Sequence, residues 1–346
     1  MVDYLWYLLT GVNVVQSKKD DRPLVSVVII SYNQEDYILE CLESIRLQTY
    51  DRIELIVSDD CSSDGTWRHI EQWESNHGPR FEKIHIHRNE VNLGITGNLS
   101  GALNMVTGEY VKMLGADDLL FPNAIARFVE VSTHDGYDWV MSNYVIIDES
   151  GTKLRKNNFT TYIEWVLSQS SNIQLLELLI DNYITAPSVF LSHSMICRYG
   201  NFENRPRNLE DAPMWINMLK EGNRVHYMPE ELVYYRFHEN ALSHSKNMTV
   251  KRTFSQNSIE LLDRYIFPSI PKWAHLIRWH RILQRYQHRF RLKTTPRHVR
   301  IASIVTYVDL FNPIYMLRRI DPDKQRFNRY LVTKYARRLE LEEKKK

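Results

Sequence analysis

The chain has 346 residues, 43% of them hydrophobic and 25% charged, and its formal net charge is +2. This is the composition of a globular chain, and three widely spaced cysteines (Cys41, Cys61 and Cys197) argue against a disulfide framework and indicate a reducing compartment. The charge is uneven, because residues from 251 onward hold 23 Lys and Arg against 8 Asp and Glu, whereas the remainder is acidic. We therefore expect one sizeable domain followed by a basic C-terminal region.

The N-terminal segment, residues 1–21, contains an apolar and aromatic run at 4–15. This run is shorter than the roughly 20 residues that a membrane-spanning helix needs. It has neither a basic leader nor a small-residue cleavage pattern. Two interpretations stay open, a helix packed on the protein or an anchor at the membrane interface.

Strand and helix patterns alternate along the first half of the chain. Residues 24–30 form a continuous β-branched run, which is typical of a strand buried on both faces, and a helical pattern of apolar residues follows. Similar predicted strands occur at 52–58, 83–87, 110–114 and 138–147. The repeated units predict an α/β fold with a mostly parallel sheet.

Acidic residues follow two of these predicted strands. Asp59 and Asp60 come after the second strand, and Asp117 and Asp118 follow the fourth, just before Pro122. Ligands of open α/β sheets bind at the carboxyl ends of strands, and carboxylates there can hold a divalent cation. The alternative is that Asp117 and Asp118 only cap the next helix.

Four motifs in this region carry a resemblance to a known family. They are VSVVIISYN, ELIVSDDCSSDGT, NLGITGN and GEYVKMLGADDLLFP, in order over residues 25–122. Together they resemble the nucleotide-binding half of a family 2 glycosyltransferase of the GT-A fold. The Gly-rich fingerprint of a dinucleotide-binding unit and a P-loop are both absent after the first strand.

The resemblance implies a set of residues that contact the nucleotide of a nucleotide-sugar donor. Tyr32 would stack near the base, and Asp60 would accept a hydrogen bond from the uracil imide, whereas Asp59 could equally cap a helix. The full implied set is Ser31, Tyr32, Asn33, Asp60, Asn92, Asn98, Ala116, Asp117 and Arg236.

The metal motif of the family, Asp-X-Asp followed by Asp, corresponds to residues 115–118. The first position is Gly115 here, which removes one carboxylate. Asp117 is then the expected direct ligand of Mn²⁺ or Mg²⁺, and Asp118 is a further candidate.

Glu210 and Asp211 lie at the start of a predicted amphipathic helix. The helix dipole alone would favour acids at this position. The resemblance instead implies that Asp211 is the catalytic base, which takes the proton from the acceptor hydroxyl. We expect an exposed carboxylate with a pKa near 4, ionised at neutral pH.

Residues 232–245, LVYYRFHENALSHS, resemble the strand and loop that close the site in this family. Arg236 and His238 would point to the same side if the strand continued through them. The resemblance implies that His238 reaches the metal or the diphosphate. A purely structural role for this histidine is the alternative.

The last hundred residues lie outside the resemblance. Apolar residues recur at helical spacing, and four arginines follow another face, Arg278, Arg281, Arg285 and Arg289. Such basic amphipathic helices suit an anionic membrane surface, or they form an appendage packed on the first domain with solvated arginines. No recognised module supports nucleic-acid binding.

These inferences predict a GT-A α/β catalytic domain at residues 22–246 and a basic helical region at 247–346. The expected enzyme is an inverting glycosyltransferase. It would move a sugar, in the first place from a UDP-sugar, to a glycan or lipid-linked glycan acceptor of a bacterial surface polysaccharide. The predicted location is the cytoplasm or the cytoplasmic face of the inner membrane. The rival functions are a non-catalytic nucleotide-sugar-binding protein and a sugar nucleotidyltransferase.

Overall fold

The computed structural model describes residues 21–157, 159, 161–200, 209, 211–238, 248–293, 314 and 326–344. The apolar N-terminal run, Glu210 and nearly all of the segment 294–325 lie outside the described residues. In the described part of the chain, no helix is both long and apolar enough to cross a membrane.

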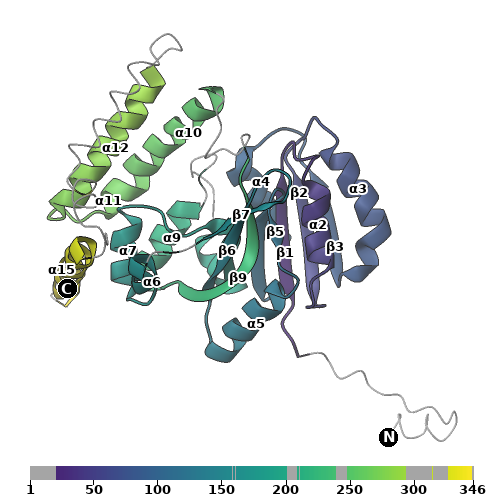
Figure 1. Ribbon diagram of the computed structural model, residues 1–346, viewed down its shortest axis with the longest axis horizontal. Coiled ribbons are helices and arrows are strands. Elements are labelled where there is room, and N and C mark those ends of the chain that lie inside the picture. Colours follow the sequence, from purple (N-terminus) through teal and green to yellow (C-terminus); the bar gives the residue numbers. More distant parts are fainter. Residues whose placement is uncertain are drawn as a thin grey trace, which may run out of the picture.

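A nine-stranded mixed sheet lies at the centre of the described chain (Figure 1). Its strands are β1 (Val25–Ser31), β2 (Ile53–Asp59), β3 (Lys83–Arg88), β4 (Tyr110–Gly115), β5 (Leu119–Leu120), β6 (Trp139–Ile147), β7 (Lys153–Lys156), β8 (Val189–Ser192) and β9 (His226–Arg236). They follow the order β3-β2-β1-β4-β8-β6-β9-β5, and β7 pairs with β6. The first four strands of this order are mutually parallel, whereas β8 runs antiparallel to both of its neighbours.

The five strands predicted in the first half are all present. The apolar runs of β1 and β2 form central strands because nearly every side chain along them is buried on one face or the other. The strand predicted near the end of the catalytic domain is longer at its beginning and shorter at its end than expected. It begins at His226 and ends at Arg236, so it does not continue through His238.

Helices cover both faces of the sheet (Figure 1). They are α2 (Ile38–Arg46), α3 (Thr66–His77), α4 (Gly94–Leu103), α5 (Ala124–Asp135), α6 (Thr161–Leu167), α7 (Ser171–Leu178), α8 (His193–Tyr199), α9 (Asp211–Lys220), α10 (Met248–Leu261), α11 (Phe267–Ser269), α12 (His275–Lys293) and α15 (Arg326–Glu343). Two short 3-10 helices, η1 (Gly78–Arg80) and η2 (Ala186–Ser188), and one π-helix, η3 (Leu262–Ile266), accompany them. The alternation of side chains along β1 separates two hydrophobic clusters. Val27 and Ile29 pack with α2, α3 and α5, whereas Val28 packs with α4 and the later helices.

The C-terminal helices share the second of these clusters. Ile277 of α12 and Val332 of α15 are buried in the same group of side chains as Leu176 of α7 and Trp215 of α9. In Figure 1, α10 and α12 lie beside α7 and α9, at the opposite end of the molecule from α3. The basic region is therefore packed on the α/β sheet assembly rather than separated from it.

The expected solvated arginine face of α12 is wrong for three of its four members. Arg281 is buried and donates to carbonyl oxygens of α7 and the residue after it, and Arg278 donates to the Ile270 carbonyl. Arg285 pairs with Asp263 of η3, while Arg289 is exposed. Helical spacing predicted correctly that the four arginines share a face. It did not show that neighbouring segments bind three of them, two through carbonyl groups at or near helix ends, which attract cations, and one through a carboxylate.

Candidate active site

The carboxyl ends of β1, β2 and β4 meet at one edge of the sheet. Ser31 lies opposite Asp59, and Ile30 lies opposite Gly115, so the loops that follow these strands emerge together. Asn33 and Cys61 in these loops have positive φ angles of 52° and 61°, which side chains other than glycine adopt rarely. The nucleotide contacts predicted from the sequence therefore lie at an edge of the sheet that is formed by adjacent loops with sharp turns.

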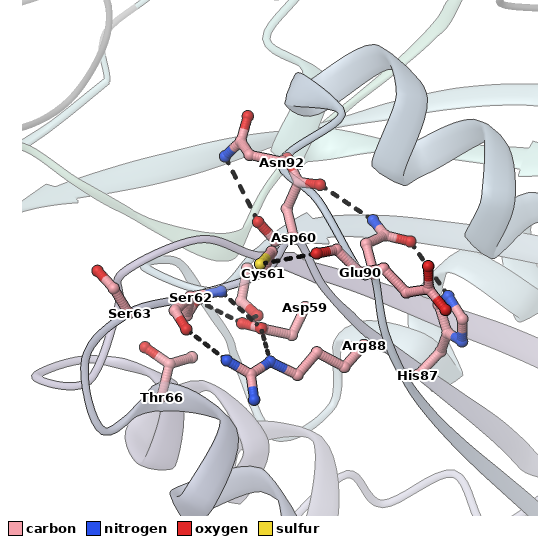
Figure 2. Close-up of polar contacts among 12 residues, drawn as sticks. Asp59, Asp60, Cys61, Ser62, Ser63, Thr66, His87, Arg88, Glu90 and Asn92 are labelled. Atoms are coloured by element: carbon pink, nitrogen blue, oxygen red, sulfur yellow. Dashed lines mark hydrogen bonds and ion pairs between the residues drawn. The ribbon is translucent and has the colours of Figure 1, made fainter.

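Asp59 is a structural acid of this edge. It is fully buried, and its carboxylate accepts hydrogen bonds from the Ser31 hydroxyl (3.0 Å) and the Ser62 backbone N–H (2.9 Å). The Arg88 guanidinium lies 3.5 Å from it and also donates to the Ser62 carbonyl (Figure 2). These contacts shape the loop after β2. They do not cap a helix, because α3 begins at Thr66 with Gly65 as its N-cap and has no side-chain capping bond, so the capping alternative is wrong.

The Asp60 carboxylate caps the N-terminus of α4. Its two carboxylate oxygens accept hydrogen bonds from the backbone N–H groups of Leu93 and Gly94, each at 2.8 Å, and from the side chain of Asn89 (3.0 Å). A carboxylate offers about four lone-pair positions, so capacity for one further donor is left. The hydrogen bond from a uracil imide to Asp60 stays a prediction. The protein already holds the Asp60 carboxylate in a fixed position.

The two predicted asparagines of this region lie differently. Asn92 donates to the backbone carbonyl of Asp60 at 3.4 Å (Figure 2). Asn98 is buried, and its amide is engaged by Ser58 on β2 and by Asn89. The Asn98 Oδ1 therefore accepts two hydrogen bonds from the protein, and the side chain holds the loops at the carboxyl end of β2 together.

The loop after β1 presents one exposed aromatic ring. Tyr32 is 47% exposed, whereas Ser31 is buried. The Asn33 side chain accepts from the Ser63 backbone N–H at 2.8 Å, and its own backbone N–H donates to the Ser62 hydroxyl. The loop is therefore rigidly tied to the loop after β2, and the Tyr32 ring is left open for stacking against a flat ligand.

Asp117 and Asp118 follow Gly115 and the buried Ala116 at the end of β4. The Asp117 carboxylate is 24% exposed, and its Oδ2 lies 2.9 Å from Nε2 of His238. Asp118 is buried, and its Oδ1 accepts the backbone N–H of Arg236. Burial, followed by the nearby Asp117 charge, raises the pKa of Asp118 well above its ordinary value.

The alternative that these acids only cap the next helix is contradicted. Helix α5 begins at Ala124, and its N-cap residue, Asn123, makes no side-chain capping bond. Both carboxylates instead contact the end of β9 and the residues after it.

The position of the Asp117 carboxylate explains why residue 115 is a glycine. A Cβ atom at this position would lie 2.6 Å from Oδ1 of Asp117, inside van der Waals contact. The observed position of the Asp117 carboxylate, and with it the contact to His238, therefore depends on the absence of a side chain at residue 115.

Arg236 was predicted as a nucleotide contact, but its guanidinium binds the protein. The side chain is buried, with Nε donating to the Asp117 carbonyl (2.8 Å) and Nη1 to the Asp148 and Glu149 carbonyls. Nη2 pairs with Glu40 of α2 at 2.6 Å. The residue joins four separate segments and holds the backbone of the Asp117–Asp118 loop.

Arg236→Met is expected to lower the free energy of unfolding by about 3 kcal/mol, because buried carbonyl groups would lose their donors. Urea unfolding measures this change. Arg46→Met is the matched control, since Arg46 pairs only locally with Glu43 on the surface and should change stability little. Equal stability of the two variants would show that Arg236 does not hold the loop.

Asp211 is the first residue of α9 and is partly buried. Burial raises its pKa, while the hydrogen bond from the Ala212 backbone N–H (2.7 Å) opposes this effect. The expectation of an exposed carboxylate with a pKa near 4 is therefore wrong. Sequence placed the acid at a helix start but could not show that α7 and the segment after it pack against α9.

Sequence reasoning also missed a buried cation beside the predicted metal loop. Lys112 of β4 is fully buried, and its Nζ donates to the carbonyls of Met113 and Val189 at 3.2 Å and to that of Pro187. Burial lowers its pKa to about 7, and the Asp118 charge opposes that shift. A lysine within an apolar strand pattern was the available signal, because burial of such a charge requires partners.

Solved structures with the same arrangement identify the fold. Residues 1–349 of S. aureus TarS, in complex with UDP-GlcNAc, match with a TM-score of 0.54 at 16% identity, covering 91% of this chain and 92% of that one. The mannosyltransferase PcManGT from Pyrobaculum calidifontis, in complex with GDP-Man and Mn²⁺, matches with a TM-score of 0.55 at 16% identity, covering 91% and 87%. The fold is thus the α/β GT-A fold of sugar-transferring enzymes.

The sequence model described as glycosyl transferase family 2 matches residues 26–201, and the chain belongs to this family. An uncharacterized glycosyltransferase of Haemophilus influenzae is 30% identical over 71% of this chain and 76% of its own length. The putative teichuronic acid biosynthesis glycosyltransferase TuaG of Bacillus subtilis is 29% identical, covering 70% and 90%. WfaP of Escherichia coli, a UDP-Glc:α-D-GlcNAc-diphosphoundecaprenol β-1,3-glucosyltransferase, is 27% identical, covering 64% and 81%. The protein is a glycosyltransferase.

Proposed function

We propose that this glycosyltransferase moves a sugar from a UDP-sugar to a hydroxyl group of a glycan acceptor, with inversion at the anomeric carbon. The observation that carries the proposal is the Asp117–His238 pair, 2.9 Å apart, at the edge of the sheet where the loop of Tyr32 emerges. The UDP-GlcNAc complex of TarS and the UDP-Glc donor in the name of WfaP support the choice of nucleotide.

The residues present fit a divalent cation. A carboxylate and an imidazole face one another at this pair, and the buried Nδ1 of His238 has no hydrogen-bond partner among the described residues. No group of three ligating side chains occurs in the described part of the chain, which suits an ion completed by diphosphate oxygens and water. Asp117 and His238 would hold Mn²⁺ or Mg²⁺. Such an ion neutralises charge on the leaving diphosphate when it is bound.

The chain's own residues supply the remaining steps. Tyr32 offers its exposed ring to the base, and Asp60 offers its remaining lone pair to the uracil imide. Asp211 accepts the proton of the acceptor hydroxyl while that oxygen forms a bond to the anomeric carbon. The bond from this carbon to the diphosphate breaks in the same displacement, so the configuration inverts without a covalent enzyme intermediate.

Titration of the purified protein with UDP, GDP and dTDP tests the donor assignment. We expect UDP to bind at least about tenfold more tightly in the presence of Mn²⁺ than in excess chelator, because the ion links the diphosphate to Asp117 and His238. Calorimetry measures both affinities. Preferred binding of GDP or dTDP would overturn the UDP assignment and leave the sugar-transfer proposal intact.

The acceptor we propose is a lipid-linked glycan of a bacterial surface polysaccharide. The names of TuaG and WfaP, which refer to teichuronic acid biosynthesis and to a diphosphoundecaprenol acceptor, support this choice. Helix α12 is the proposed contact with the membrane, because Trp279 and Tyr286, seven residues apart, are 50% and 62% exposed on it.

Replacement of both Trp279 and Tyr286 by Ala is expected to reduce sedimentation with anionic lipid vesicles severalfold, since aromatic side chains anchor at the interface. Tyr330→Ala is the control, as this exposed tyrosine lies on α15. Unchanged vesicle binding by the double variant would contradict the membrane contact.

A further inference from the structure

Tyr37 lies immediately before α2, at the end of the loop that begins with Tyr32. The centroid of its ring is 5.2 Å from that of the His238 imidazole, and the two ring planes are tilted by 49°. The guanidinium carbon of Arg236 lies over the same ring, 4.9 Å from its centroid. These are the distances of favourable aromatic and cation–π contacts. One half-buried ring therefore contacts two residues at the end of β9 and just beyond it.

The protein itself fixes the backbone that carries the Tyr37 ring. The Tyr37 N–H donates to the Gln34 carbonyl at 3.0 Å, and the Tyr37 carbonyl accepts the N–H of Cys41 at 3.1 Å. Cys41 is fully buried in the hydrophobic cluster that α2 shares with β1. Glu40, three residues after Tyr37, pairs with Arg236 at 2.6 Å. Residues three apart share one side of a helix, so Tyr37 and Glu40 approach the end of β9 together.

Nothing among the described residues hydrogen-bonds to the second nitrogen of the His238 ring, the buried Nδ1. A histidine that binds a metal usually donates through its second ring nitrogen to an oxygen atom of the protein, and this bond fixes the orientation of the ring. Here Nε2 faces the Asp117 carboxylate at 2.9 Å, and the Tyr37 ring packs against the imidazole. Packing against Tyr37 can therefore limit the rotation of the imidazole that a hydrogen bond at Nδ1 would otherwise limit.

We propose that Tyr37 is a positioning residue of the metal site: its ring holds the His238 imidazole in the orientation that faces Asp117. This inference rests on the proposed function, because it assigns a role toward the ion that Asp117 and His238 would hold. It adds that the two ends of one loop serve different parts of the donor. The exposed ring of Tyr32 is left for the base, whereas the ring of Tyr37 orients a ligand of the ion.

A purely structural role for Tyr37 predicts a different result. If the ring only covered the Arg236 guanidinium, its removal would lower the resistance to urea and leave the effect of Mn²⁺ on UDP affinity unchanged. If the ring positions His238, its removal weakens that effect, because an imidazole that can rotate must be ordered when the ion binds. UDP affinity without the ion should then stay the same, since the ring acts only through the metal ligand.

The test compares Tyr37→Leu and Tyr37→Phe with the control Tyr137→Leu. Tyr137 also packs its ring on a histidine, His226, with centroids 3.5 Å apart, but at the opposite end of β9. Calorimetric titration with UDP, in Mn²⁺ and in excess chelator, measures the effect of the ion. We expect Tyr37→Leu to lose about tenfold in UDP affinity with Mn²⁺ present and less than about twofold in chelator. Tyr37→Phe, which keeps the ring, and Tyr137→Leu should match the wild type.

A double-mutant cycle with His238→Ala identifies the residue through which Tyr37 acts. The variant that combines Tyr37→Leu with His238→Ala should bind UDP in Mn²⁺ no more weakly than His238→Ala alone, because the ring then has no imidazole to hold. Urea unfolding of every variant shows that it is folded. If Tyr37→Leu does not fold, Tyr37→Met replaces it in both comparisons with the same expected loss.

A wild-type Mn²⁺ effect in Tyr37→Leu would overturn the positioning role. So would equal losses from Tyr37→Leu in the wild-type and His238→Ala backgrounds, or a tenfold loss in Tyr37→Phe, which would show that the ring is not the group that acts. Failure of the proposed metal site is distinguishable, because Mn²⁺ would then leave the UDP affinity of the wild-type protein unchanged. That outcome would overturn the metal site and this inference together.

Discussion

Asp211→Asn is expected to lower kcat for sugar transfer about a thousandfold while the affinity for the donor nucleotide stays within about twofold. The amide has nearly the shape of the carboxylate but cannot accept the proton of the acceptor hydroxyl, and general-base catalysis contributes factors of this size. Steady-state kinetics with a nucleotide-sugar and an acceptor, together with calorimetric titration of UDP, measure the two quantities.

The matched control is Glu221→Gln, just beyond the other end of α9, where the carboxylate pairs with Arg198. This variant should keep wild-type kcat. Full activity of Asp211→Asn would remove the base assignment. Donor binding by the wild-type protein without transfer to any acceptor would instead favour the nucleotide-sugar-binding alternative.

The pH dependence of this reaction has a definite sign. Burial raises the pKa of Asp211, and the base works only in its ionised form, so activity falls as the pH drops through this raised pKa. The acid limb of the kcat profile should therefore lie above the value near 4 that an exposed aspartate gives. A limb at or below 4 would show that the base is a different, exposed group.

Asp117→Ala is expected to abolish the effect of Mn²⁺ on UDP affinity, a loss of about a hundredfold in binding with the ion present. The carboxylate faces His238 and is the exposed acid of the pair, so it is the one that can reach an ion. Titrations with Mn²⁺ and with chelator measure the difference.

Asp118→Asn provides the contrast. Asp118 is buried and accepts the backbone N–H of Arg236, which an asparagine oxygen can also accept. This variant should retain Mn²⁺-dependent binding. If Asp117→Ala bound UDP equally well with and without Mn²⁺, its role as a metal ligand would be ruled out.

The sequence was sufficient for the fold because the strands that define it are buried on both faces. Val25–Ser31 and Ile53–Asp59 are rich in β-branched and other apolar residues, which is typical of central strands that are buried on both faces. The acidic pairs at the ends of the second and fourth strands then mark the edge of the sheet where a ligand is expected. Family motifs then located Asp117 and Asp211, as residues whose roles stay predictions.

The direction and burial of side chains could not be predicted in the same way. Arg236 binds carbonyl groups and Glu40 from three distant segments, and no local pattern shows whether a guanidinium will meet a ligand or the protein. Arg281 is a similar case, since helical spacing gave its face but not the end of α7 that it meets. The surroundings of Asp211 likewise depend on the packing of α9 against α7, a helix from an earlier part of the chain.

The bare backbone at Gly115 also constrains the mutational routes open to this protein. An acid introduced there to restore the family's usual first aspartate would need the space that Oδ1 of Asp117 occupies. The added side chain would therefore require the Asp117 carboxylate to move from the position in which it contacts His238. We therefore expect the effect of a substitution at residue 115 on metal-dependent UDP binding to depend on which residues occupy positions 117 and 238, rather than to be additive with changes there.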